Sequence, residues 1–268
     1  MPLLTIVPTF PTWHRPYVAL YEQTIVNQFD AIIAGYSGTI KQGLQQAAPT
    51  WRLPYWEWAT DQPAIPVEFT TTSIQIYGTN GQLTDLQPNP FAYYEFNPID
   101  PSFSGSYKVY PITLRSPSTS DAKAISQPEL SNENLQGSDL KDSTWKIFSE
   151  ASDWDSFSNE STKSADAAGP MGSLEGVHGT VHNCTGGTVP RLFGHMTNIP
   201  VAAFDPIFWL HHCQVERLLT LWQTIYYAFP VPDTQPQLSN IHAQSRLIAN
   251  REEPRSLPKI IDCNGHIR

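Results

Sequence analysis

Five of the chain's eight histidines lie between residues 178 and 212, and their spacing could bind a metal ion. His178 and His182 stand four residues apart in Glu-Gly-Val-His-Gly-Thr-Val-His, which puts both imidazoles on one face of a helix. The pair alone is equally consistent with two exposed histidines that bind nothing. The residues between the two histidines lack the glutamate of the zinc protease motif HExxH.

A third imidazole comes from Asp-Pro-Ile-Phe-Trp-Leu-His-His-Cys-Gln-Val-Glu-Arg at 205–217. His212 stands one turn after Phe208, on the apolar face of a predicted helix. A histidine on such a face is usually a buried core residue, but here a second helix already offers two imidazoles. Three neutral imidazoles suit copper, zinc or iron, and the ligand type alone does not choose among these metals.

Helices must hold these histidines, and the apolar spacing predicts them at five places. Ser173 is a good N-cap for one of them, and Asp205 with Pro206 predicts the start of the longest. The predicted helices cover residues 16–34, 40–48, 143–151, 173–183 and 205–227.

Between the helices, residues 59–140 are rich in Pro, Ser, Thr, Asn and Gly, which predicts long loops with short strands such as 73–77 before the turn at Asn80-Gly81. The expected fold class is mainly α, an antiparallel helix bundle that holds the metal site, with long loops and short strands. We expect one domain over 1–230 and an irregular tail over 231–268.

Composition excludes some classes of partner. A net charge of -9 argues against nucleic acid, and no apolar stretch approaches the roughly 20 residues of a membrane span. The three cysteines, Cys184, Cys213 and Cys263, fit no disulfide or zinc pattern, so we expect free thiols. Free thiols and the lack of a signal peptide favour an intracellular protein, although a truncated start would hide a leader.

Residues 173–223 resemble the second copper-binding motif of tyrosinases, catechol oxidases and molluscan haemocyanins. That motif is an HxxxH helix followed by Asp-Pro-x-Phe-x-x-His-His-x-x-Val-Asp-Arg. The resemblance implies that His178, His182 and His212 bind one copper ion and that His211 is a structural neighbour. Glu216 stands where the family usually has Asp.

The stretch from Phe10 to Glu22 resembles the end of the family's first copper motif, which makes His14 the third ligand of a second copper ion. Leu-Pro-Tyr-Trp-Glu-Trp at 53–58 resembles the family's Tyr-Trp-Asp-Trp segment. Arg15 and Arg217 are expected to form ion pairs beside the two sites.

The first copper motif is incomplete, because Thr5 occupies the position of its second ligand and residues 1–13 contain no histidine. The sequence therefore predicts one full copper site and one ligand of the other. Two explanations stay open: a fragment of a longer protein, which the abrupt start favours, or a natural variant with a damaged site.

The resemblance implies a copper oxidoreductase whose two copper ions bind O2 and oxidise o-diphenols to o-quinones, and some members first hydroxylate monophenols. The expected partners are a small phenolic substrate and O2. Glu175 maps to a glutamate that holds a water proposed to deprotonate the phenol; a plain helix N-terminal acid is the alternative.

Three positions bear on the substrate pocket. Gly179 stands where monophenol-hydroxylating relatives often have Asn, which favours diphenol oxidation only. Phe208 maps to an aromatic residue that stacks on substrate rings and Ile199 to the pocket mouth, although both could be ordinary core residues. Two other functions compete with the oxidase: an oxygen carrier, and an inactive chain that binds at most one copper ion.

Overall fold

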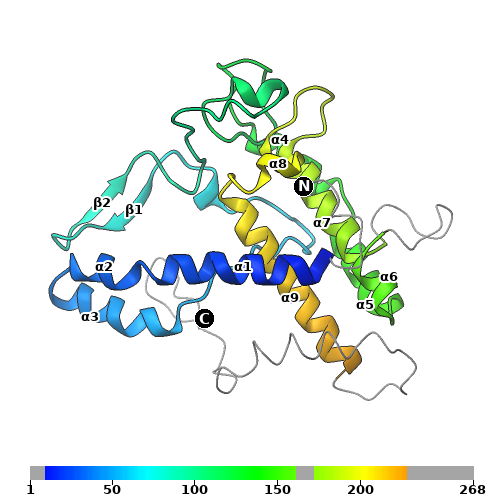
Figure 1. Ribbon diagram of the computed structural model, residues 1–268, viewed down its shortest axis with the longest axis horizontal. Helices are drawn as coiled ribbons and strands as arrows, with labels where there is room; N and C mark the ends of the chain where they lie inside the picture. Colours follow the sequence, from blue (N-terminus) through cyan, green and yellow to red (C-terminus); the bar gives the residue numbers. More distant parts are fainter. Residues whose placement is uncertain (1–9, 161–171, 228–268) are drawn as a thin grey trace.

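The computed structural model describes residues 10–160 and 172–227 of the chain. The predicted tail at 231–268, with Cys263 in it, lies outside the described residues, and the division into a domain and a tail stays a prediction. Figure 1 shows helices crossing one another at the centre, with long connections around them.

The first predicted helix is two helices. Helix α1 runs over Phe10–Val26 and α2 over Phe29–Ala34, with a turn at residues 27–28 between them. The prediction of one helix over 16–34 was therefore wrong at its start and in its middle. Pro16 lies inside α1 rather than at its first position, because helix geometry already begins at Phe10, upstream of the apolar spacing that suggested the start.

Helices α7 (Leu174–Gly186) and α9 (Ile207–Tyr227) carry the histidine motifs. Oγ of Ser173 accepts a hydrogen bond from the backbone N–H of Gly176 at 3.1 Å, which confirms the predicted N-cap. At α9, Oδ1 of Asp205 accepts from the backbone N–H of Ile207 at 3.2 Å. The predicted cap residues of both helices therefore act at the helix starts, with boundaries shifted by a residue or two.

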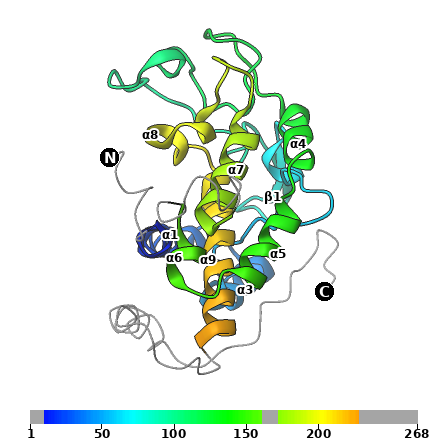
Figure 2. The same ribbon diagram turned by 90° about the vertical axis from the view of Figure 1, so that its right-hand side faces the viewer.

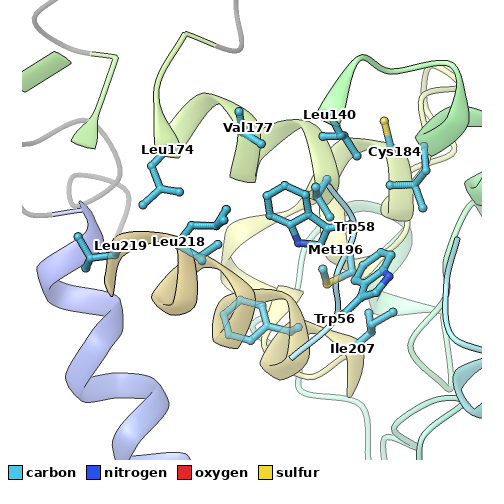
Figure 3. Close-up of a cluster of buried hydrophobic side chains, with 14 of the residues drawn as sticks. Trp56, Trp58, Leu140, Leu174, Val177, Cys184, Met196, Ile207, Leu218 and Leu219 are labelled. Carbon is cyan, nitrogen blue, oxygen red and sulfur yellow. The ribbon is translucent and has the colours of Figure 1, made fainter. Parts of the chain in front are cut away.

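The hydrophobic core lies between α7 and α9 and is closed by the aromatic run at 53–58. Figure 3 shows Trp58 below Val177 and Leu140, and Trp56 beside Ile207, within one buried cluster. Trp222 on α9 is fully buried, and its ring stacks on Phe157 with centroids 4.2 Å apart. Fully burying a large apolar side chain contributes about 1.5–3 kcal/mol, so this cluster fixes the two motif helices against each other.

The remaining elements surround this core. The predicted helices at 40–48 and 143–151 are present as α3 (Gly38–Ala47) and α5 (Leu140–Glu150), and the predicted strand is β1 (Ile74–Tyr77), paired antiparallel with β2 (Leu83–Leu86). The sequence missed three short helices, which are α4 (Pro128–Gln136), α6 (Trp154–Ser158) and α8 (Ile199–Ala202). Short 3-10 helices complete the described chain as η1 (Ala48–Thr50), η2 (Val67–Phe69), η3 (Gly105–Lys108) and η4 (His195–Thr197).

Helix α1 packs across α9 and also touches α7, so three helices from both ends of the described chain meet at one place. Figure 2, turned by 90°, shows α1 nearly end-on beside α9. The mainly helical fold class with short strands and long loops is confirmed. Within the described helices, none is long and apolar enough to cross a membrane.

Candidate copper site

Four imidazoles converge where α7 and α9 face each other. His178, His182, His211 and His212 each offer a ring nitrogen, and these nitrogens all lie within 4.8 Å of one another. The centroids of the four rings are 4.5–5.4 Å apart. We call these four residues the histidine cluster. The i, i+4 pair on α7 and the adjacent pair on α9 therefore meet as a single group.

Two backbone carbonyl groups fix ring tautomers at the site. Nδ1 of His182 donates its hydrogen to the carbonyl oxygen of Met196 at 2.6 Å, and Nδ1 of His14 donates to the carbonyl oxygen of Phe10 at 2.7 Å. Each ring then carries its lone pair on Nε2. Such carbonyl partners are typical of histidines that bind metal ions.

Nε2 of His182 lies 3.2 Å from Nε2 of His212. In the metal-free chain, His212 can donate the Nε2 hydrogen to His182, whose own hydrogen is on Nδ1. Two imidazole nitrogens bound to one ion at about 2.0–2.1 Å would also lie about 3 Å apart. A metal ion can therefore replace this proton with little movement of the rings.

The cluster contains buried nitrogens that have no well-formed hydrogen bond among the described residues. The rings of His178 and His211 have only weak contacts with the backbone of Glu175 and His178 and no well-formed hydrogen bond, and Nδ1 of His212 has none within the described ranges. A buried polar atom without a good partner costs about 1–3 kcal/mol, so such a group would be a penalty in an ordinary core. A bound metal ion would satisfy part of this need, and imidazole is a ligand that suits copper.

Burial keeps the imidazoles neutral. It lowers the pKa of His182 and of His14 to about 4, with the carbonyl contacts opposing the shift. Burial, together with the neighbouring histidines, holds the pKa of His178, His211 and His212 well below the usual range. At neutral pH the lone pairs needed for metal binding are therefore available.

His14 lies beside the cluster, as the resemblance implies. It is buried, and its ring stacks on His212 with centroids 4.5 Å apart and an interplanar angle of 22°. Its centroid is 5.8 Å from that of His178. Phe10, itself fully buried, packs against both His14 and His178. The structure thus gathers all four predicted ligands, and their role in binding copper stays a prediction.

His211 lies inside the group of possible ligands, although the family resemblance implied a structural role for it. Its ring is nearly parallel to that of His178, at 11°, with centroids 5.1 Å apart, and it faces Trp58 at 5.9 Å. The buried Nε1 of Trp58 also lacks a partner in the described part of the chain. The adjacent position of His211 in the His-His pair was the only signal in the sequence for its presence here.

The three predicted pocket residues differ in exposure. Phe208 is buried, and its ring lies 4.0 Å from that of His212, so it forms an apolar wall of the site. Ile199, the first residue of α8, is 59% exposed and is therefore not a core residue. A Cβ added at Gly179 would meet no atom within 4 Å, apart from those of its neighbours in the helix, so there is open space at this position.

Glu175 lies in the first turn of α7, one turn before His178. Its Oε2 accepts a hydrogen bond from the backbone N–H of Glu160 at 3.1 Å. Burial raises the pKa of the Glu175 carboxyl to about 7, against the effect of that hydrogen bond. A carboxyl group with a pKa near neutrality can accept a proton, which an exposed acid at a helix N-terminus would do poorly.

The sequence did not indicate Arg115, which ties the long loops to the start of α9. Its guanidinium pairs with Asp205 through NH2 to Oδ1 at 2.5 Å and Nε to Oδ2 at 3.0 Å, and both side chains are buried. It also donates to the backbone carbonyl group of Phe69. His195 joins the same loops to the segment before α8, since its Nδ1 accepts a hydrogen bond from the backbone N–H of Leu114 at 3.0 Å.

Comparisons with known proteins agree with this geometry. The profile of the family described as the common central domain of tyrosinase matches residues 4–225. A tyrosinase of Neurospora crassa is 34% identical over 228 residues, which cover 81% of this chain and 32% of that protein. The chain therefore spans about a third of the length of this relative.

Solved structures give the same result. A mushroom tyrosinase, crystallised in latent and active forms, matches with a TM-score of 0.72 and 33% identity over 84% of this chain and 57% of that one. A copper-bound active-tyrosinase mutant of Aspergillus oryzae matches with a TM-score of 0.74 and 26% identity, over 88% and 67% of the two chains. The chain, with its cluster of imidazoles, belongs to the tyrosinase family of copper proteins.

Proposed function

We propose that this chain forms the copper-binding core of a phenol oxidase that converts o-diphenols to o-quinones with O2. The observation that carries the proposal is the convergence of four neutral imidazoles beside His14, three of them buried and with ring nitrogens that lack a well-formed hydrogen bond. Copper bound there would supply the electron transfer between the phenol and O2. His178, His182 and His212 would hold one ion, and His14 would contribute to a second.

The protein's own groups would orient the ligands and exclude water. The Phe10 and Met196 carbonyl groups hold two rings with Nε2 free, and the Phe10 and Phe208 rings cover the site with apolar surface. Apolar walls suit a flat phenolic ring, and the space beside Gly179 gives it room.

Glu175 would take the phenolic proton, directly or through a water molecule. Its raised pKa places the carboxylate form close to equal with the acid form near pH 7, which suits a group that must accept a proton and release it again. The absence of a side chain at Gly179, where hydroxylating relatives often have Asn, favours diphenols as substrates.

The test is oxidation of 4-tert-butylcatechol by the copper-loaded full chain, followed by quinone absorbance and oxygen uptake. We expect turnover in the wild-type chain and its loss in the His212→Ala chain. Wild-type chain that binds copper and consumes no oxygen with the catechol would contradict the oxidase assignment. Oxygen that is bound reversibly without quinone formation would point to a carrier instead.

A second candidate function is copper binding without oxidation. The observation that favours it is the uneven division of the imidazoles, with four in the histidine cluster and His14 stacked beside them. The copper content separates the two candidates, because two ions per chain are expected of the oxidase and one ion of the inactive form.

A further inference from the structure

A hydrogen-bonded ion pair joins α1 to α9 beside the histidine cluster. Nε of Arg15 lies 2.6 Å from Oε2 of Glu216, and the two side chains are only 19% and 15% exposed. The same guanidinium donates to Oε1 of Gln223 at 3.1 Å and to Oγ1 of Thr220 at 3.3 Å. Three side chains of α9 therefore hold Arg15.

The pair is in register with the imidazoles. Arg15 follows His14 on α1, and Glu216 stands one turn after His212 on α9. The two contacts, His14 on His212 and Arg15 on Glu216, therefore join the same two short stretches of helix. A rotation of α1, or a slide along α9, that broke the ion pair would also displace the His14 ring.

We propose that Arg15 and Glu216 are a positioning pair for the copper site, which sets the rotation and height of α1 so that His14 presents Nε2 beside His212. This inference rests on the proposed copper site. Arg15 and Glu216 lie outside the histidine cluster and act through the two helices.

Glu216 depends on Arg15 for compensation of its charge. Oε1 of Glu216 is buried and has no hydrogen-bond partner within the described ranges, so Arg15 supplies the contact to the carboxylate. Loss of one partner of a buried pair leaves an uncompensated charge, which the structure can relieve by moving α1 away from α9. His14 would move with α1.

The chain offers a matched control on the next residue of α9. NH1 of Arg217 lies 2.6 Å from Oε2 of Glu57, at the same separation as the first pair. This second pair links α9 to the aromatic run at 53–58 and not to α1. Both pairs belong to the same helix, but the Arg217–Glu57 pair is more exposed, at 37% and 36% against 19% and 15%, so thermal unfolding must separate a loss of stability from a loss of positioning.

The experiment measures Cu(II) binding to the metal-free full chain by competition titration, with electron paramagnetic resonance of the bound ion and thermal unfolding of each variant. We expect R15M and E216Q each to weaken Cu(II) binding by about tenfold and to change the resonance spectrum. R217M should stay within about twofold of wild type. In a chain that already carries H14A, R15M should have no further effect, because it acts through His14.

A folded R15M chain that binds Cu(II) like the wild type would overturn the positioning role. Equal losses in R15M and R217M, or a full loss from R15M in the H14A background, would overturn it as well. If R15M does not fold, the Cu(II) affinity and resonance spectrum of E216Q test the positioning role in its place, because glutamine keeps the shape of Glu216. A wild-type chain that binds no copper would defeat the proposed copper site itself, so the two failures are distinguishable.

Discussion

At the residue scale, the site is a set of imidazoles that burial keeps uncharged. The sequence located four of the candidate ligands from spacing and family likeness, because an i, i+4 pair and an apolar-face histidine are local patterns. It could not place His211 among them, since the direction of a ring depends on packing against Trp58 and His178. The raised pKa of Glu175 likewise comes from burial, which spacing does not reveal.

The lowered histidine pKa values predict acid sensitivity of the metal-free chain. His14 and His182 titrate at about 4 when folded and at about 6.5 when unfolded, so the unfolded chain binds more protons in this window. The free energy of unfolding is therefore highest above pH 6.5. It decreases as the pH falls towards 4, by up to ~3 kcal/mol for each of the two histidines. Urea unfolding from pH 7 to 4.5 measures this loss.

Glu175 has the opposite effect on the free energy of unfolding. Its raised pKa makes the folded chain take up a proton as the pH falls below 7, which stabilises the folded chain. A Glu175→Gln chain therefore isolates the histidine contribution. A free energy of unfolding that stays constant between pH 6.5 and 4.5 in that chain would show that the imidazoles are not buried as the structure has them.

Glu175 should also control the pH dependence of catechol oxidation. We expect the wild-type rate to fall as the pH drops through about 7, when the carboxylate becomes protonated. Glu175→Gln should lower kcat by about 10²-fold and remove this acidic limb. An unchanged pH profile in the variant, measured by steady-state quinone formation, would leave Glu175 as a helix N-terminal acid only.

At the scale of helices and strands, the sequence predicted the helix caps and the apolar helix faces, but it did not predict where a helix is interrupted. Ser173 and Asp205 act at the starts of α7 and α9 as expected, because caps are local hydrogen bonds. Apolar spacing does not encode the break at residues 27–28 between α1 and α2, where the backbone N–H of Gln28 donates to the carbonyl oxygen of Ile25, or the short helix α8. The sequence also did not predict that η4 orients His182, because Met196 makes this contact through its backbone carbonyl group and not through its side chain.

Close backbone packing holds that segment. The backbone N–H of Gly194 donates to the carbonyl oxygen of Gly186 at 2.7 Å, and a Cβ at Gly194 would collide with the carbonyl oxygen of Leu114. We expect Gly194→Ala to destabilise the chain by about 1–3 kcal/mol and to weaken copper binding, because it displaces η4 and the Met196 carbonyl group. Chemical unfolding and copper titration measure both effects.

Gly43 on α3 is the matched control, because a Cβ there would meet nothing within 4 Å. Gly43→Ala should stabilise the chain by up to about 1 kcal/mol through helix propensity. Tolerance of alanine at Gly194 as at Gly43 would contradict the packing of η4 against Leu114.

At the scale of the whole molecule, long-range contacts bring the two ends of the described chain to one site. Helix α1 supplies His14, and α7 and α9 supply the cluster from far along the sequence. The tract at 59–140 that reads as loops is joined to α9 by the buried pair of Arg115 and Asp205, the residue that starts α9, and to α7 by contacts such as the hydrogen bond from Ser131 to the carbonyl oxygen of Thr185. A lone arginine in a polar tract carries no signal of this, so the sequence could predict the helices but not what holds the loops on them.

The Arg115–Asp205 pair should therefore carry more stability than an exposed pair. Arg115→Met should cost about 3–5 kcal/mol, because it leaves the Asp205 carboxylate buried without its partner. The exposed pair of Lys141 and Asp61 is the control, and Lys141→Met should cost less than about 1 kcal/mol. Equal costs for the two variants in chemical unfolding would show that Arg115 does not anchor the loops.

The copper affinity of the metal-free chain tests the histidine cluster directly, when it is measured by competition titration for wild type, His182→Ala, His212→Ala and His195→Ala. Burial lowers the pKa of His195 to about 4, as it does for His182, but His195 lies outside the histidine cluster. We expect wild type and a folded His195→Ala chain to bind copper with similar affinity, and the two cluster variants to bind at least about 10²-fold more weakly. Wild-type affinity in the His212→Ala chain would contradict the account.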